Sequence, residues 1–252
     1  MRLRYATAPR RQWVPLTALA CLIFLLLVYW QLPASLLLRY LDLRSLQGSP
    51  VASGTLWQGS LRQVAWPGVP VNEVRWTLSP WYALSGHLRG RVSARGPSTA
   101  ASATFRFTLD GNGELTAAQG RLPLAALQPT ARAPWQGGVE WGSSRLQFSH
   151  WRPTAHAGWV EVHDLRAPTA TATLGSFRAD WDHLEDTQGR VRELSGALKL
   201  RGSLQRLPLG GYQLHVEVRP QPAATPVQIA TLAMFGPADA TGLRTATLEF
   251  GH

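Results

Sequence analysis

The sequence predicts a mainly β protein, in which a single N-terminal transmembrane helix precedes an antiparallel β-domain with a curved or open sheet. Two observations lead to this prediction. From Gln12 to Leu38 the chain runs 27 residues without a charged side chain, more than the ~20 residues that a helix needs to cross a bilayer. Beyond this run, apolar and polar residues alternate in segment after segment, which is typical of strands with one buried face and one wet face.

The apolar segment has positive charge on its N-terminal side. Four arginines precede it, at positions 2, 4, 10 and 11. By the positive-inside rule they predict a cytoplasmic tail at 1–11, a transmembrane anchor at 12–38 and a periplasmic β-rich domain at 39–252, in a bacterial inner membrane. Leu32-Pro33-Ala34 leaves a cleaved signal peptide open as the alternative, although bulky aromatic residues just before it disfavour a cleavage site.

The composition argues against nucleic acid as a partner. A net charge of +10 would normally raise that interpretation. Half of it, six arginines less Asp42, lies within residues 1–45, and the rest is spread along the predicted strands of an exported domain. The single cysteine, Cys21, falls in the anchor, so the exported part has to be stabilised by packing rather than by disulfides.

Alternation of apolar and polar residues is clearest in five segments. These are residues 73–78, 87–95, 104–109, 198–204 and 212–219. Turn residues separate the predicted strands, at Pro67-Gly68, Gly96-Pro97, Asp110–Gly113, Gly137-Gly138, Gln188-Gly189 and Gly210-Gly211. About ten short strands with no long helical pattern between them predict an antiparallel sheet. Helix is expected only in short pieces such as Pro226–Phe235.

Two similar segments raise the question of an internal repeat. Leu84-Ser85-Gly86 and Leu194-Ser195-Gly196 each precede a leucine-containing strand pattern. They hint at two related halves, 50–128 and 138–252, joined through Pro129–Gly138. The alternative is a coincidence of the kind that any hairpin-rich chain produces.

The sequence offers no recognisable reaction chemistry. It lacks the common catalytic motifs, and one cysteine excludes a thiolate zinc site. A metal site at His150, His156 and His163 is disfavoured because His156 and His163 lie among the alternating residues of predicted strands. The acidic group Asp180, Asp182, Glu185 and Asp186 fits a solvated loop better than a calcium site. We therefore predict a protein that is not an enzyme, with no cofactor and no catalytic or metal-binding residue.

Tryptophan is the unusual residue type. Nine of the 11 tryptophans lie between positions 57 and 181. Because aromatic residues suit half-buried sheets, core packing is one interpretation. The other is an aromatic-lined concave face that binds an apolar ligand or a partner strand.

The N-terminal part of the predicted domain resembles a known family. Gly54–Ser60 (GTLWQGS), soon after an anchor, is similar to the start of the type II secretion system protein N family, also called general secretion pathway protein N. Trp76–Pro80 and Leu84–Leu88 fit its next segment, and Leu194–Pro220 fits a later one. The resemblance implies an accessory inner-membrane component for the export of folded proteins from the periplasm. It would act as a non-catalytic scaffold or assembly subunit with other secretion subunits as partners.

Three tryptophans coincide with this N-terminal resemblance and are the candidate partner-binding residues: Trp57, Trp76 and Trp81. An alternative family likeness remains open. A single anchor followed by an open sheet also resembles the AsmA-like proteins and the bitopic component of lipopolysaccharide transport. In that case the apolar strand faces would bind lipid in a groove. The first resemblance implies a protein partner and the second a bound lipid.

Overall fold

The chain folds around one large sheet. A computed structural model describes residues 13–36, 50–64, 69, 71–127, 135–167, 173–184, 186–207 and 211–250. The predicted cytoplasmic tail and the predicted turns at Pro67-Gly68 and Gly210 lie outside the described residues.

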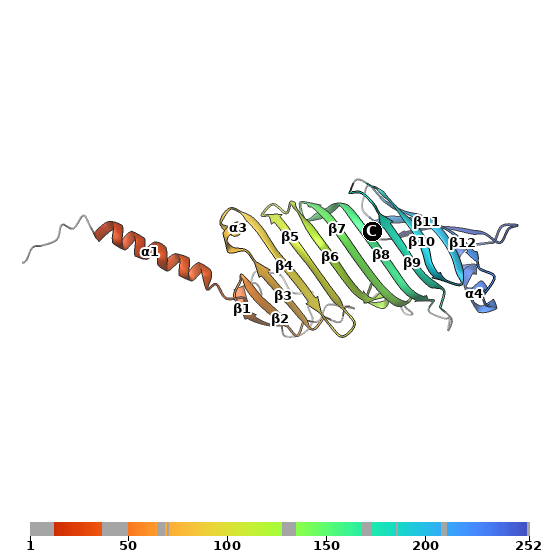
Figure 1. Cartoon of the computed structure of the whole chain (residues 1–252), viewed down its shortest axis with the longest axis horizontal. Coiled ribbons are helices and arrows are strands. Elements are labelled where there is room, and N and C mark those ends of the chain that lie inside the picture. Colours follow the sequence, from red (N-terminus) through yellow and green to blue (C-terminus); the bar gives the residue numbers. More distant parts are fainter. Residues whose placement is uncertain are drawn as a thin grey trace, which may run out of the picture.

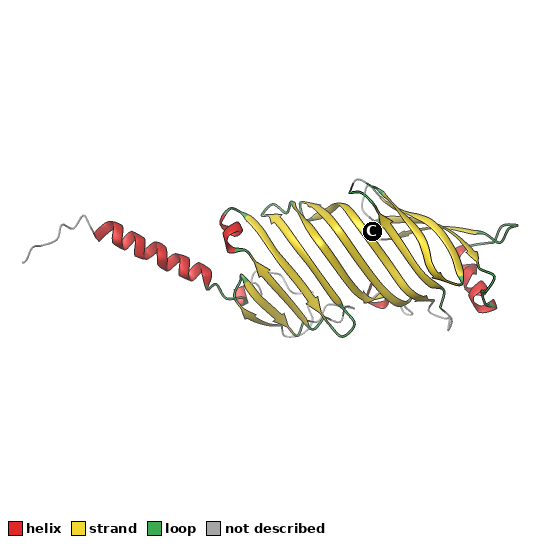
Figure 2. Ribbon diagram, viewed as in Figure 1, coloured by secondary structure: helices red, strands yellow, loops and turns green. Residues whose placement is uncertain are grey.

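Thirteen strands form a single open antiparallel sheet, and each strand pairs with its neighbours in sequence order (Figures 1 and 2). The strands are β1 (Val51–Gly54), β2 (Gln58–Arg62), β3 (Glu73–Leu78), β4 (His87–Arg95), β5 (Ala100–Thr108), β6 (Gly113–Pro123), β7 (Gln136–Ser149), β8 (Arg152–Arg166), β9 (Gly175–Trp181), β10 (Gln188–Gly196), β11 (Leu198–Arg206), β12 (Tyr212–Pro220) and β13 (Arg244–Phe250). This confirms the mainly β, open-sheet prediction, with more strands than the ten expected.

The helices are few and, apart from the first, short. They are α1 (Trp13–Trp30), α3 (Pro80–Leu84) and α4 (Pro226–Thr231), with 3-10 helices η3 (Leu124–Leu127) and η4 (Leu232–Phe235). Together α4 and η4 confirm the short helix predicted at Pro226–Phe235. A capping box begins it, because Thr225 and Gln228 each satisfy the other's backbone N–H.

The continuous helix predicted for 12–38 is shorter than expected. It ends at Trp30, and Pro33 forms an isolated bridge with Thr55 at the first edge of the sheet. Pro33 has no backbone N–H to donate within a helix, which favours this ending. Among the described residues, no helix combines the length and the apolar character that a membrane crossing requires.

The two edges of the sheet differ. At the first edge, the Ala34 N–H donates to the Gly54 carbonyl (3.1 Å) and the Leu56 N–H donates to the Leu32 carbonyl (2.7 Å). At the other edge, β13 pairs only with β12 among the described strands. The sheet therefore has the open edge that an unclosed antiparallel sheet is expected to have.

The hydrophobic core lies at the C-terminal end. There the sheet curls away from the viewer in Figure 1, with α4 beside its end. Buried side chains of β9, β11, β12, η4 and the residue before β9 meet in one cluster, which contains Leu174, Phe177, Leu198, Leu200, Val216, Val218 and Leu232. Leu232 and Val218 are fully buried, so η4 closes this end of the curved sheet.

Two predicted turns are wrong. Gly137-Gly138 lies in β7 and Gln188-Gly189 lies in β10. Gly189 sits under the Trp181 ring and Gly137 faces the His163 carbonyl, so close approach across strands explains these glycines better than turn geometry does. The predicted turns at Gly96-Pro97 and Asp110–Gly113 are confirmed, because they join β4 to β5 and β5 to β6.

The division into two related halves stays a prediction. The sheet continues across the expected joint, since β6 pairs with β7 along most of its length. Leu84-Ser85-Gly86 ends α3 and enters a turn, whereas Leu194-Ser195-Gly196 belongs to β10.

Candidate functional site

The end of α1 is fastened to the sheet by Trp57. The Trp57 ring lies 4.6 Å from the Tyr29 ring between centroids, and its Nε1–H donates to the Tyr29 carbonyl at 2.8 Å. The Tyr29 hydroxyl donates to the Pro80 carbonyl at 2.8 Å. Trp57 is only 8% exposed. This candidate residue therefore joins the helix to the sheet.

The other two candidate tryptophans lie nearby in different surroundings. Trp76 is half-buried on β3, and its Nε1–H donates to the Leu56 carbonyl at 3.0 Å. Trp81, on α3, is 65% exposed and packs edge-on against Trp30 at 5.7 Å. Together Trp30, Trp81, Tyr82 and Leu84 form an exposed apolar surface, which we call the α3 patch.

Four of the tryptophans are explained by glycines on neighbouring strands. Each ring lies across a strand at a glycine, where an added Cβ atom would come within 3.2 Å of it. The pairs are Trp76 over Gly59, Trp141 over Gly120, Trp159 over Gly142 and Trp181 over Gly189, with Phe105 over Gly90 and Phe107 over Gly113 repeating the arrangement. Aromatic cover of strand glycines is a known stabilising device. Sequence reasoning missed it because the strand register decides which residues face each other.

Strand pairing divides the side chains into an apolar and a charged face. One row of directly paired residues crosses the whole sheet and contains only apolar residues: Ala52, Leu61, Val74, Ala94, Ala101, Gly120, Trp141, Val160, Ala179, Val191, Gly202, Val216 and Ala246. We call this side the inner face. It continues from the α1 joint to the buried core at the C-terminal end.

His156 is a polar residue on the inner face. Its ring lies 4.5 Å from the Trp181 ring and 6.3 Å from the Tyr212 ring. Burial lowers the pKa of His156, and the nearby positive charge of Arg206 lowers it further. His163 instead lies on the other side of the sheet, 3.3 Å from Glu161. The three histidines considered from the sequence are thus not gathered at one point.

The acidic side chains considered for calcium are already engaged. Asp180 pairs with Arg178 (2.6 Å) and Arg192 (3.3 Å), and Asp182 pairs with Arg190. The Asp186 carboxylate accepts from the His183 backbone N–H at 2.8 Å, while Glu185 lies outside the described residues. Within the described ranges, no three histidine, cysteine or acidic side chains are placed to hold a metal ion.

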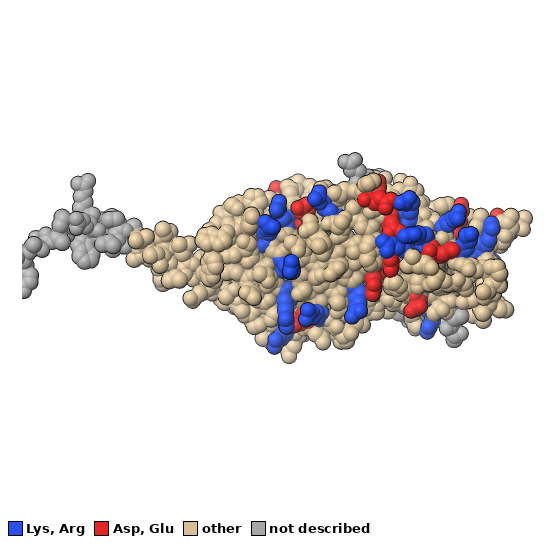
Figure 3. Space-filling model, in the orientation of Figure 1, with Lys and Arg blue, Asp and Glu red and all other residues tan. Residues whose placement is uncertain are grey.

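The opposite side of the sheet, which we call the outer face, carries the charges (Figure 3). A second row of directly paired residues lies next to the apolar row, one residue away along each strand. It contains Val51, Arg62, Glu73, Arg95, Ala100, Arg121, Glu140, Glu161, Arg178, Arg192, Arg201, Glu217 and Thr245. We call it the charged row. Ala100 interrupts the charges between two arginines.

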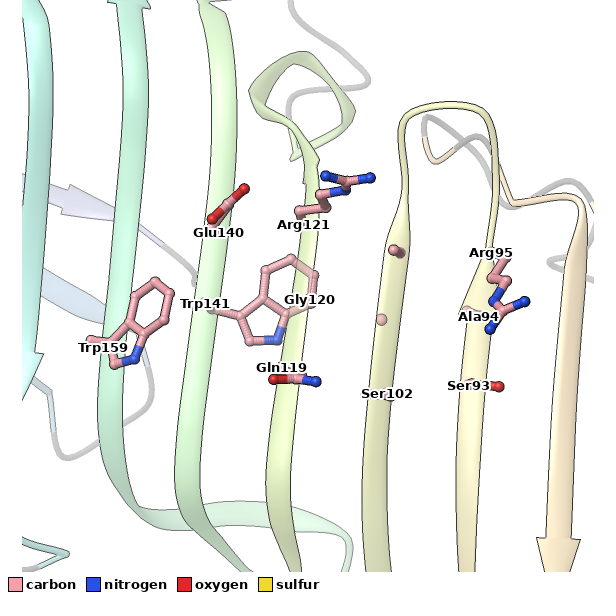
Figure 4. Close-up of a pocket in the computed structure, with 12 residues that line it drawn as sticks. Ser93, Ala94, Arg95, Ser102, Gln119, Gly120, Arg121, Glu140, Trp141 and Trp159 are labelled. Carbon is pink, nitrogen blue, oxygen red and sulfur yellow. The ribbon is translucent and has the colours of Figure 1, made fainter.

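A hollow of about 500 Å³ lies at this interruption (Figure 4). Its two sides are neighbouring rows of outer-face side chains. One side is formed by Ser93, Ser102, Gln119 and Trp159, and the other by Arg95, Ala100, Arg121 and Glu140. The guanidinium of Arg178 lies over the Trp159 ring, 4.7 Å from the ring centroid. The hollow therefore combines cationic, hydroxyl, amide and aromatic groups.

Comparison with known proteins gives one match. Residues 50–246 match the family described as type II secretion system (T2SS), protein N. No curated protein and no solved structure matches the chain. The match covers the sheet from the residue before β1 into β13.

Proposed function

The chain belongs to the type II secretion system protein N family, and on that premise we propose that it is a non-catalytic scaffold or assembly subunit of the secretion machinery. Involvement in type II secretion follows from the family. The scaffold role is supported by a long sheet with an exposed aromatic patch at one end and an open edge at the other. Its partners would be other subunits of the machinery.

We propose that the apolar segment 12–38 anchors the protein in the inner membrane, with the sheet in the periplasm. The charge-free run and the four arginines before it support this orientation. In this topology, alkaline phosphatase fused after His252 should be active. A phosphatase fusion that is produced normally but is inactive would contradict the orientation.

The α3 patch is the surface that we assign to a partner subunit. It contains Trp81, one of the three candidate residues, and its large side chains are exposed rather than packed under the sheet. Exposed aromatic groups of this kind are enriched in protein interfaces. Trp57 and Trp76, which are more buried, would hold the patch in place instead of contacting the partner.

Trp81→Ala tests this assignment in cells that depend on the chain for secretion. Because the ring is 65% exposed, the variant should fold normally and yet reduce secretion several-fold. Trp151→Ala is the matched control, since Trp151 is 59% exposed but lies at the β7–β8 turn. Normal secretion by a folded Trp81→Ala protein would remove the α3 patch from the mechanism.

A second candidate function, the binding of lipid acyl chains, is favoured by the inner face. The apolar row crosses all thirteen strands and begins next to the end of α1. A bound peptide would leave its own amides unsatisfied against this apolar surface, which is costly. An acyl chain has no polar group along its length, so it suits the inner face better.

A photoreactive palmitate analogue tests lipid binding on the full chain in detergent. Labelling should fall on inner-face residues such as Val92, Phe105 and Leu115 after mapping by mass spectrometry. The internal control is the outer face of the same strands, for example Arg91 and Thr104. Equal labelling of both faces would contradict a specific acyl-chain site.

A further inference from the structure

The charged row has a neutral residue, Ala100, between two arginines. Like charges also face each other elsewhere in the row, at Glu140–Glu161 and along Arg178, Arg192 and Arg201. Across β2 to β4 it runs Arg62, Glu73, Arg95, with opposite charges directly facing each other. On β5 the next position is Ala100, and on β6 the row resumes with Arg121. Opposite charges across a strand pair are stabilising and like charges are not. At Ala100, therefore, no acidic group of the row lies between the two arginines.

Several arginines elsewhere on the same face have acidic partners. On β8 to β10, Arg178 pairs with Glu161 (2.5 Å), and Arg192 pairs with Asp180 (3.3 Å). Arg95 and Arg121, beside the hollow, make no ion pair with another described residue.

The acids next to the hollow have other basic side chains nearby. Glu73, opposite Arg95, pairs with Arg62 (3.3 Å) and Arg75 (2.9 Å). Glu140, opposite Arg121, lies 3.8 Å from His163. The imbalance extends to the whole outer face of β2–β7, where eight arginines face three glutamates. They are Arg62, Arg75, Arg89, Arg91, Arg95, Arg106, Arg121 and Arg145, with Glu73, Glu114 and Glu140.

From this arrangement we infer that the hollow over Ala100 binds an acidic side chain from an extended segment of a partner protein. The carboxylate lies in the charged row, between Arg95 and Arg121. Ser93, Ser102 and Gln119 along the facing side offer hydroxyl and amide groups to the rest of that segment. This inference deepens the proposed scaffold role by giving the chemistry of one partner surface.

The dimensions favour an extended acidic segment over one small anion. Arg95 and Arg121 belong to strands separated by β5, about 10 Å apart by the usual strand spacing. Figure 4 shows their side chains extending on either side of β5 instead of meeting at one point. Further arginines follow along β4, at positions 89 and 91. Several carboxylates spaced along a polypeptide match this pattern.

The test replaces Ala100, the neutral residue between the two arginines, with a charged side chain of the protein itself. Ala100→Glu supplies an acid, and Ala100→Gln supplies the same shape without its charge. Thr245→Glu adds a negative charge to the far end of the same row, on β13. Each full-length variant in detergent is titrated with a fluorescein-labelled peptide of alternating glycine and glutamate, with the glutamine peptide and inorganic phosphate as parallel arms.

The wild-type chain should bind the glutamate peptide in a salt-dependent manner and bind the glutamine peptide at least tenfold more weakly. Ala100→Glu should weaken binding of the glutamate peptide at least tenfold, whereas Thr245→Glu should change that binding by no more than about twofold. Ala100→Glu should also melt about 1–3 °C above Ala100→Gln, because the charged row is completed.

Three results would overturn the inference. They are an equal loss of binding in Ala100→Gln and Ala100→Glu, a lower melting temperature in Ala100→Glu than in Ala100→Gln, and displacement of the peptide by equimolar phosphate. The peptide assay does not require secretion. A normal peptide result with a failed Trp81→Ala test would therefore reject the α3 patch alone.

Discussion

Replacing Trp57 with alanine should destabilise the protein by about 3–5 kcal/mol, the usual range for a buried tryptophan. The ring is buried against Tyr29, and its Nε1–H satisfies the Tyr29 carbonyl. The variant should also release the end of α1 from the sheet. Denaturant unfolding of the full chain measures the first effect. Hydrogen exchange in β1 and β2 measures the second, and it should increase strongly.

Two substitutions separate the contributions at this joint. Trp57→Phe keeps an aromatic ring but removes the hydrogen-bond donor. Its free energy of unfolding should fall by about 1 kcal/mol for the lost hydrogen bond, and by a smaller amount for the lost packing. Trp81→Ala, at an exposed position of the same region, should lose less than about 1 kcal/mol. If Trp57→Ala leaves exchange in β1 and β2 unchanged, the joint does not depend on this ring.

Local patterns in the sequence were enough to predict the architecture. Period-two alternation in segments such as 87–95 and 212–219 depends only on neighbouring residues, and both segments are strands. The hairpin at Asp110–Gly113 was equally local, because its glycines suit a tight turn. The resemblance at Gly54–Ser60 was also confirmed, since the matched family region includes it.

The long central strands were harder to predict, for a physical reason. The β7–β8 ladder contains register shifts, including one between Ser143 and Arg145. Each bulge moves the following side chains to the other face, so alternation breaks within a continuous strand. Gly137-Gly138 and Gln188-Gly189 resemble turns in the sequence, although they lie inside strands.

The surfaces depended on information that no local pattern contains. The sequence placed Trp57, Trp76 and Trp81 near one another, but only the fold distinguishes a buried joint at Trp57 from an exposed patch at Trp81. The charged row and its gap at Ala100 appear only when the register of every strand pair is known. Residues 95, 100 and 121 are unremarkable as a sequence pattern.

Gly120→Val should destabilise the protein by about 3 kcal/mol, at the upper end of the usual cost of overpacking. A Cβ atom at Gly120 would collide with the Trp141 ring, which lies across β6 at this point. The ring must leave or the strands must separate, and either change combines overpacking with lost aromatic cover. Thermal and denaturant unfolding of the full chain measure the loss.

A double mutant determines whether the collision is the cause. In Gly120→Val/Trp141→Ala the obstructing ring is gone, so adding valine to the Trp141→Ala background should destabilise far less than adding it to the wild type. Gly138→Val is the matched control on the neighbouring strand, because a Cβ atom there meets nothing within 4 Å. It should stay within about 1 kcal/mol of the wild type, since valine suits a strand better than glycine. Equal losses at Gly120 and Gly138, or no rescue in the double mutant, would mean that strand glycines are required for a reason other than the rings that cover them.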